Sequence, residues 1–198
     1  MKKILLGFLI LSSLVLVTGC KESLQVGSEK IAEKSQADKP NWLNKAPDND
    51  ADNLYFVGQT ESGSIDGVRD AYQLAISKVS STIGVYASSA YEVVDKAFGN
   101  EVGKKMRDEF IQNLTKQNII RGVKEKQNYW EKMEVSQDKG VRYYYRVYSL
   151  AFLPKKSFEQ SVNEVLTGQI NGAKDALNTK LQESLELTRT KLLNEINK

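Results

Sequence analysis

Hydrophobic and polar residues follow several different patterns along this chain, and each pattern predicts a different kind of segment. Residues 4–17 are almost all apolar, whereas residues 21–40 are polar with no apolar period. Residues 64–97 repeat apolar side chains at steps of three and four, which is typical of one buried stripe on a helix. A break at Phe98-Gly99-Asn100 precedes a second expected helix, at about 101–116.

Three stretches, one before and two after these helical segments, are rich in β-forming residues. Residues 54–60 form a short run, and residues 119–135 and 141–153 are joined by a five-residue connection that contains Gly140. A connection of this kind is typical of a hairpin. We therefore expect an N-terminal strand and a long hairpin, together with the long helix at 64–97. Alanines in that helix would allow it to lie close to a sheet.

The second strand of the expected hairpin alternates between two sets of side chains. We expect one set to face the core: Val141, Tyr143, Tyr145 and Val147. The other set is a candidate partner surface, because Tyr and Arg are enriched at interface hot spots: Arg142, Tyr144, Arg146 and Tyr148. Cross-strand pairing of long amphipathic side chains on an ordinary exposed face explains the same pattern, and this alternative stays open.

Residues 155–198 predict an extended C-terminal amphipathic helix, with a weak point at Gly168 and Gly172. Its apolar seam includes Leu177, Leu181, Leu185 and Leu192. The mean step is slightly above 3.6 residues, which does not favour a left-handed coiled coil. Such a helix would reach about 60 Å, longer than a small domain can cover. We therefore expect these leucines to self-associate or to contact another protein; a helix folded back on the domain is the alternative.

The start of the chain has the layout of a secretory signal peptide. Lys2 and Lys3 precede the apolar run, which is too short to cross a bilayer comfortably. The end of the run, Val17-Thr18-Gly19-Cys20, resembles the lipobox of bacterial lipoprotein precursors. We predict that residues 1–19 are removed and that Cys20 carries a diacylglycerol and an N-acyl chain. Ordinary cleavage leaving a free thiol, or a short uncleaved anchor, is the alternative.

The residues after Cys20 predict how the protein is placed in the envelope. Residues 20–40 cannot bury enough apolar surface to offset their ordering entropy, so we expect a flexible lipidated tether. Lys21 follows the cysteine where lipoproteins retained in the inner membrane often carry Asp. By analogy we expect the outer membrane, with the domain on its periplasmic or surface face.

Composition excludes several kinds of chemistry. The chain has no histidine and one cysteine, so Cys/His and Ser/His/Asp catalytic groups and the usual zinc sites cannot form. The net charge of +3 falls to about +1 once Lys2 and Lys3 are subtracted, which gives no case for nucleic acid. We expect no enzyme activity and no cofactor beyond the lipid.

The sequence of one acidic loop matches the first part of a calcium-binding motif. Asp48, Asp50 and Asp52 fall on the first, third and fifth positions of an EF-hand loop. However, Asn53 replaces the required glycine and Gln59 replaces the bidentate glutamate. The pattern therefore favours a solvated turn, and we predict no metal site.

The order of several short motifs resembles a known family. The motifs are Pro40-x-Trp42, Pro47, Tyr55-Phe56-Val57-Gly58, a helix that begins with Ala71 and Ala75, and a hairpin containing RYYYRVYSL. This order is similar to that of the LPP20 family of bacterial lipoproteins, which is akin to FlgP-like flagellar outer-membrane lipoproteins. The resemblance covers about residues 40–153 and the lipobox. It implies an α+β domain at 41–154, in which one N-terminal strand and a long hairpin form a small antiparallel sheet packed by a long helix. It also implies a structural or assembly role, whereas the length of the helix and the C-terminal extension depart from the family pattern.

Taken together, these features predict a lipid-anchored, non-enzymatic envelope protein that works through protein contacts. The expected partners are the membrane, other envelope proteins and further copies of the chain. The alternative is a tethered regulator that binds a peptidoglycan synthase or the cell wall itself.

Overall fold

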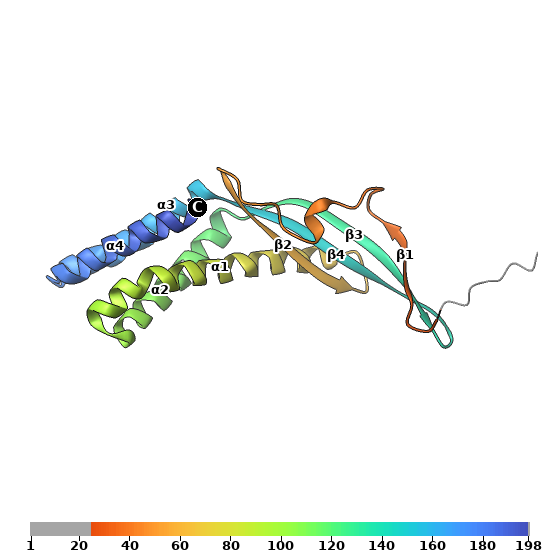
Figure 1. Ribbon diagram of the computed structural model, residues 1–198, viewed down its shortest axis with the longest axis horizontal. Coiled ribbons are helices and arrows are strands. Elements are labelled where there is room, and N and C mark those ends of the chain that lie inside the picture. The colour runs from red at the N-terminus through yellow and green to blue at the C-terminus, as the bar shows by residue number, and fades with distance from the viewer. Residues whose placement is uncertain (1–24, 198) are drawn as a thin grey trace, which may run out of the picture.

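The computed structural model describes residues 25–197, apart from the side chains of residues 117–121. The predicted signal peptide, Cys20 and the first part of the predicted tether lie outside these residues. Figure 1 shows an elongated molecule with a twisted sheet at one end and a group of helices at the other. Within the described part of the chain, none of the helices has the length and apolarity needed to cross a bilayer.

The predicted α+β class is confirmed. The strands form one antiparallel sheet in the order β1-β3-β4-β2, and the described helices pack beside it. The strands are β1 (Glu29–Lys34), β2 (Asn53–Ser62), β3 (Lys124–Gln137) and β4 (Gly140–Pro154). The helices are the 3-10 turn η1 (Asn41–Leu43), α1 (Gly67–Phe98), α2 (Asn100–Arg121), α3 (Lys155–Asp175) and α4 (Thr179–Ile196).

The first half of α1 packs on one face of the sheet. Leu54 of β2 pairs with Leu153 of β4, and the next pair on the same face is Phe56 with Ala151. Because residues alternate between the two faces of a strand, this register places an apolar surface under α1. The helix lies close to the strands, as its alanines predicted, since Ala71 and Ala75 are fully buried.

The second half of α1 runs beyond the sheet and packs against the other helices (Figure 1). Gly99, with φ +86°, makes the predicted break before α2. That helix extends to Arg121, so β3 begins at Lys124, later than the predicted strand at residue 119. The rings of Tyr91 and Phe110 lie 5.4 Å apart, centre to centre, in the core between these helices. Other fully buried members of this core are Leu114, Phe158, Leu166, Leu185, Leu192 and Ile196.

The prediction of one extended C-terminal helix is wrong, because α3 and α4 form a helical hairpin. Gly168 and Gly172 lie inside α3, and the chain instead reverses at residues 176–178. Leu177 adopts a left-handed conformation there, with φ +55°, and the Asn178 side chain accepts a 3.0 Å hydrogen bond from the backbone N–H of Leu181. In this hairpin α4 packs against α1 while α3 packs against α2 and α4, so both apolar seams are buried, which a single straight helix could not do. The alternative of a helix folded back on the domain is therefore the one that the structure adopts.

The prediction of a flexible tether is wrong for residues 29–34, which form the edge strand β1. This strand pairs with β3 from Glu29 opposite Val135 to Lys34 opposite Glu131, with an irregularity between Ile31 and Glu33. All of its residues are exposed, so its sequence carries no apolar period. Main-chain hydrogen bonds and a 2.8 Å ion pair between Lys30 and Glu134 hold it instead.

This ion pair makes the attachment of β1 dependent on pH. The hydrogen bond from Lys30 holds the pKa of Glu134 below its ordinary value. The contribution of the pair is therefore present above the pKa of glutamate in the unfolded chain, and is lost as the pH falls through the lowered value. Between about pH 6 and pH 3, we expect amide protection factors in β1 to fall more than those in β4.

The matched variant is Lys30→Ala, which removes the partner of Glu134. We expect lower protection in β1 of this variant at about pH 6 and a weaker dependence on pH than in the natural protein. Equal dependence on pH in the two proteins would show that the pair does not hold β1.

Candidate functional site

The predicted alternation of β4 is correct, but only part of the expected burial is found. Val147 is fully buried on the face toward α1, as predicted, whereas Val141 and Tyr143 on the same face are about half exposed. The reason is the position of α1, which begins at Gly67, close to Val147. The outer half of the hairpin extends beyond this point, so that no helix covers it.

On the opposite face, two of the four predicted partner residues are buried inside the protein. Tyr148 is 6% exposed and packs beneath η1, in a cluster with Trp42 and Tyr129. The Tyr129 and Tyr148 rings lie 6.1 Å apart, and the Trp42 indole N–H donates a 3.0 Å hydrogen bond to the Gln127 side chain. Tyr148 is therefore a core residue that fastens the segment before β2 onto the sheet.

Tyr144 and Arg146 join three strands instead of forming an open surface. The Tyr144 hydroxyl donates a 3.0 Å hydrogen bond to Glu29 of β1, and Arg146 Nη2 donates to the same carboxylate at 3.2 Å. Arg146 Nε also lies 3.6 Å from Glu61 of β2. Tyr144 is 8% exposed and Arg146 is half-buried, so that Arg142 alone of the predicted set is exposed. The alternative of cross-strand pairing explains these residues better than a partner surface does.

A buried carboxylate lies beside this network. Glu131 is 1% exposed, and its carboxylate accepts a 3.1 Å hydrogen bond from Tyr129 and pairs with Lys39 at 3.1 Å. Burial, together with Glu131, raises the pKa of Tyr129 to about 12. The Lys39 side chain is about half exposed, and its contact with the buried Glu131 carboxylate holds Lys39 and the segment around it on the sheet.

The four C-terminal leucines also fail to form one surface. Leu185 and Leu192 are buried against the other helices, Leu181 is half-buried, and only Leu177 is exposed, at 91%. Leu177 lies alone at the turn between α3 and α4. A predicted interaction seam along this helix is therefore absent from the described surface of the protein.

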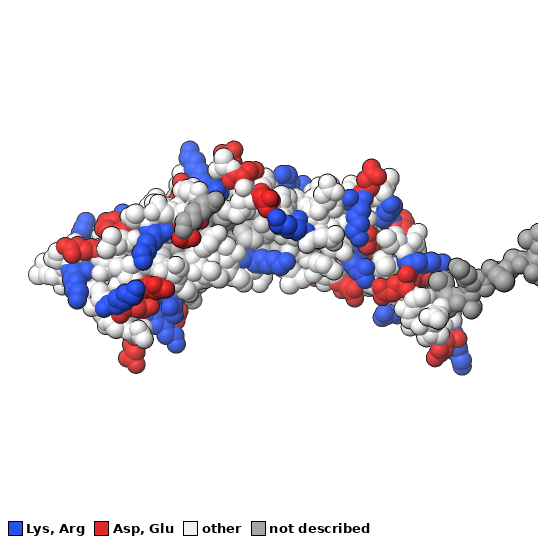
Figure 2. Space-filling view, in the orientation of Figure 1, with Lys and Arg blue, Asp and Glu red and all other residues white. Residues whose placement is uncertain are grey.

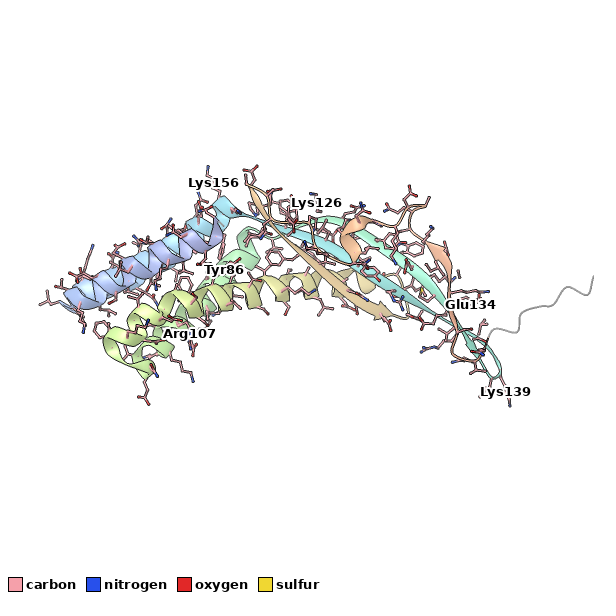
Figure 3. The ribbon with its side chains drawn as sticks, viewed as in Figure 1. Tyr86, Arg107, Lys126, Glu134, Lys139 and Lys156 are labelled. Carbon is pink, nitrogen blue, oxygen red and sulfur yellow. The ribbon has the colours of Figure 1, made fainter. Side chains whose placement is uncertain are left out.

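The structure shows a different candidate site, a groove along the free edge of β2. β2 is an outer strand of the sheet, and a groove of about 580 Å³ runs between its edge, the segment of residues 43–49 and the middle of α1. Residues 54–57 and Gln59 line it from β2. Lys78, Ser81, Thr82 and Tyr86 line it from α1. Figure 3 labels Tyr86 on α1 beside the sheet.

Two hydrogen bonds show which backbone groups point into this groove. The N–H of Tyr55 donates to Asn49 Oδ1 at 3.0 Å, and the carbonyl of Val57 accepts from Lys78 Nζ at 2.6 Å. The odd-numbered residues of β2 therefore direct their backbone groups away from β4. Gln59 is also an odd-numbered residue, so its backbone N–H and carbonyl point away from β4 too. In the described part of the chain, these two groups form no hydrogen bond.

The acidic loop beside the groove is a turn, as its sequence favoured. The Asp50 carboxylate accepts hydrogen bonds from the backbone N–H groups of Asp52 and Asn53, at 2.9 and 2.7 Å, and from the Tyr55 hydroxyl at 2.7 Å. The Tyr55 hydrogen bond is the main reason that the pKa of Asp50 lies below its usual range. Between residues 25 and 197, no group of three or more Asp, Glu or Cys side chains could hold a metal ion.

No known protein family, curated protein or solved structure matches this chain. The resemblance to LPP20 lipoproteins therefore stays a prediction from the order of motifs.

Proposed function

We propose that this protein is a lipid-anchored component of the bacterial cell envelope that works through protein contacts. The observation that carries the proposal is the position of Cys20, the sole cysteine, directly after a charged start, an apolar run and small residues. Each buried CH₂ group of an acyl chain contributes about 0.8 kcal/mol, and two or more chains hold a protein stably on a membrane. A diacylglycerol with an N-acyl chain on Cys20 meets that condition.

The fold supports a defined orientation for such an anchored protein. The described chain begins beside the tip of the β3–β4 hairpin, where the N–H of Gly27 donates a 2.8 Å hydrogen bond to the carbonyl of Ser136 (Figure 1). Seven residue steps separate Cys20 from Gly27, so the chain between them spans at most about 25 Å. In this proposal the hairpin tip stays near the membrane and the helices project away from it.

The alternative, a tethered regulator of a peptidoglycan synthase or a protein that binds the cell wall, is favoured by the elongated shape. With its anchor at one end, the molecule would carry its helical end away from the membrane (Figure 1). Incubation with purified cell-wall sacculi at low salt tests direct wall binding. Sedimentation of the protein with the sacculi would support this alternative, and failure to sediment would exclude direct binding to the wall.

Replacement of the lipidated cysteine tests the lipid anchor. In cells fed labelled palmitate, we expect label in the natural protein and only background label in Cys20→Ser, because serine has no thiol to form the thioether. Lys21→Ala is the matched control, and we expect it to keep the label. Undiminished labelling of Cys20→Ser would contradict the proposed anchor.

A further inference from the structure

We propose that the free edge of β2 binds an extended, acidic segment of a partner protein as a fifth strand of the sheet. This inference deepens the proposed function by naming the kind of partner, and it rests on the protein working through protein contacts. Recognition would use the backbone groups of β2 together with Lys78 of α1.

The backbone of β2 explains why the partner would be an extended polypeptide. The outward groups of Val57 and Gln59 form a row of hydrogen-bond donors and acceptors, and an added strand satisfies such a row at each second residue. In this structure Lys78 Nζ donates a 2.6 Å hydrogen bond to the carbonyl of Val57. An incoming backbone N–H would take over this carbonyl and release the ammonium group of Lys78.

The two edges of the sheet differ in a way that directs a partner to β2. The edge strand β1 carries charged residues at four of its six positions and has an irregular register, features that discourage pairing with another strand. Residues 54–60 of β2 carry no charge. In Figure 2, the surface over the middle of the molecule is mainly white, with isolated charged side chains.

The charge of Lys78 indicates an acidic partner. Its Nζ forms no ion pair in the described part of the chain, and the other side chains that line the groove are neutral. Once released from the carbonyl of Val57, the ammonium group would lie above the added strand. A carboxylate on that strand is the group that pairs best with it.

Exposed apolar side chains of α1 and apolar residues that line the groove would receive the alternate residues of the added strand. Leu74 and Val85 of α1 are 44% and 67% exposed, one on each side of Lys78 along the helix. Leu43 and Ala46 line the groove from the other side. A groove of about 580 Å³ has room for side chains of an extended segment.

A second copy of this chain is a poor occupant of the same edge. Antiparallel pairing of two β2 strands about Val57 would bring the Lys78 residues of both copies to the same short stretch of sheet. Like charges at such a distance repel, and neither copy offers a carboxylate among the groove residues. The partner is therefore expected to be a different protein.

Photo-crosslinking in the native cells tests this site. A photoreactive phenylalanine analogue at Ser81, which lines the groove, is compared with the same analogue at Ser88, which lies further along α1 outside it. From Ser81 we expect a crosslink to one segment of another envelope protein, located by mass spectrometry and carrying Asp or Glu within a stretch of β-forming residues. From Ser88 we expect no crosslink to that segment.

Edge variants show whether the segment is bound as a strand. Gln59→Pro removes an outward N–H without removing a hydrogen bond to β4, whereas Gln59→Ala keeps that N–H. We expect Gln59→Pro and Lys78→Glu each to lower the crosslink yield by about tenfold or more. Gln59→Ala and Lys78→Arg should preserve it. Thermal unfolding midpoints of all four variants confirm that each still folds.

Several results would overturn the inference. The first is the absence of a crosslink from Ser81. The second is a crosslink to a second copy of this chain, to lipid or to a glycan. The third is a crosslink whose yield Gln59→Pro leaves unchanged although the variant folds. The outcome is independent of the lipid anchor. Palmitate label on Cys20 without the crosslink would reject the strand site alone, and the crosslink without label would reject the anchor alone.

Discussion

Replacing Gly58 by alanine is expected to lower the free energy of unfolding by at least about 3 kcal/mol, near the upper end of overpacking effects. A Cβ atom at this position would lie 1.8 Å from the backbone carbonyl oxygen of Ala71 and 2.6 Å from the backbone nitrogen of Ala75. Because both contacts are to the backbone of α1, no side-chain rotation can relieve them. Urea unfolding followed by circular dichroism measures the effect.

The matched control is Gly84→Ala, in the middle of α1. A Cβ atom there meets no heavy atom within 4 Å. Alanine is a better helix former than glycine, so we expect this variant to gain about 0.5 to 1 kcal/mol of stability. Similar small effects of both substitutions would contradict the close approach of α1 to β2.

Replacing Leu185 by alanine is expected to destabilise the protein by about 3 kcal/mol, since the change leaves a cavity in a packed core. The Leu185 side chain is fully buried where α4 lies against the other helices. We also expect the variant and the natural protein to have the same oligomeric state, because this leucine contacts its own chain. Chemical unfolding and size-exclusion chromatography measure the two quantities.

Leu187, two residues further along α4, supplies the control because its side chain is 57% exposed. We expect Leu187→Ala to change the stability by less than about 0.5 kcal/mol. If Leu185→Ala had an equally small effect, or if it dissociated an oligomer, the helical hairpin would not be packed as described. The original expectation of an exposed leucine seam would then be favoured.

Regular periods in the sequence predicted the larger elements. The three- and four-residue steps of residues 68–86 specify a helix, and the alternation of residues 141–148 specifies a strand, because each period places one set of side chains on one side. Ala71 and Ala75 also indicated a close helix–sheet contact. These signals indicated the individual helices and strands, whereas the α+β class was implied by the resemblance in motif order.

Other features depend on contacts that no local period records. The edge strand β1 is held by main-chain pairing and by Lys30–Glu134, so its polar sequence resembles that of a flexible linker. Likewise, the turn at residues 176–178 interrupts an amphipathic seam that continues on both sides of it. Leu177 has a left-handed conformation that is unusual for leucine, which explains why Gly168 and Gly172 were the more obvious candidates for a bend.

The candidate site could not be located from the sequence because strand order was not predictable from it. The uncharged run at residues 54–60 was visible, but an inner strand would have the same composition. Only the order β1-β3-β4-β2 places β2 at an edge. Tyr144 and Arg146 of β4 were wrongly predicted to form an exposed interface, because their side chains instead bond within the sheet.

The central claim is that Cys20 attaches this protein to a membrane through lipid. The intact mass of the protein purified from its native membranes tests this most directly. We predict the mass of a chain that begins at Cys20 and carries a diacylglycerol and one further acyl chain. A mass that fits an unmodified thiol at Cys20, or a chain that still contains residues 1–19 without lipid, would contradict the account.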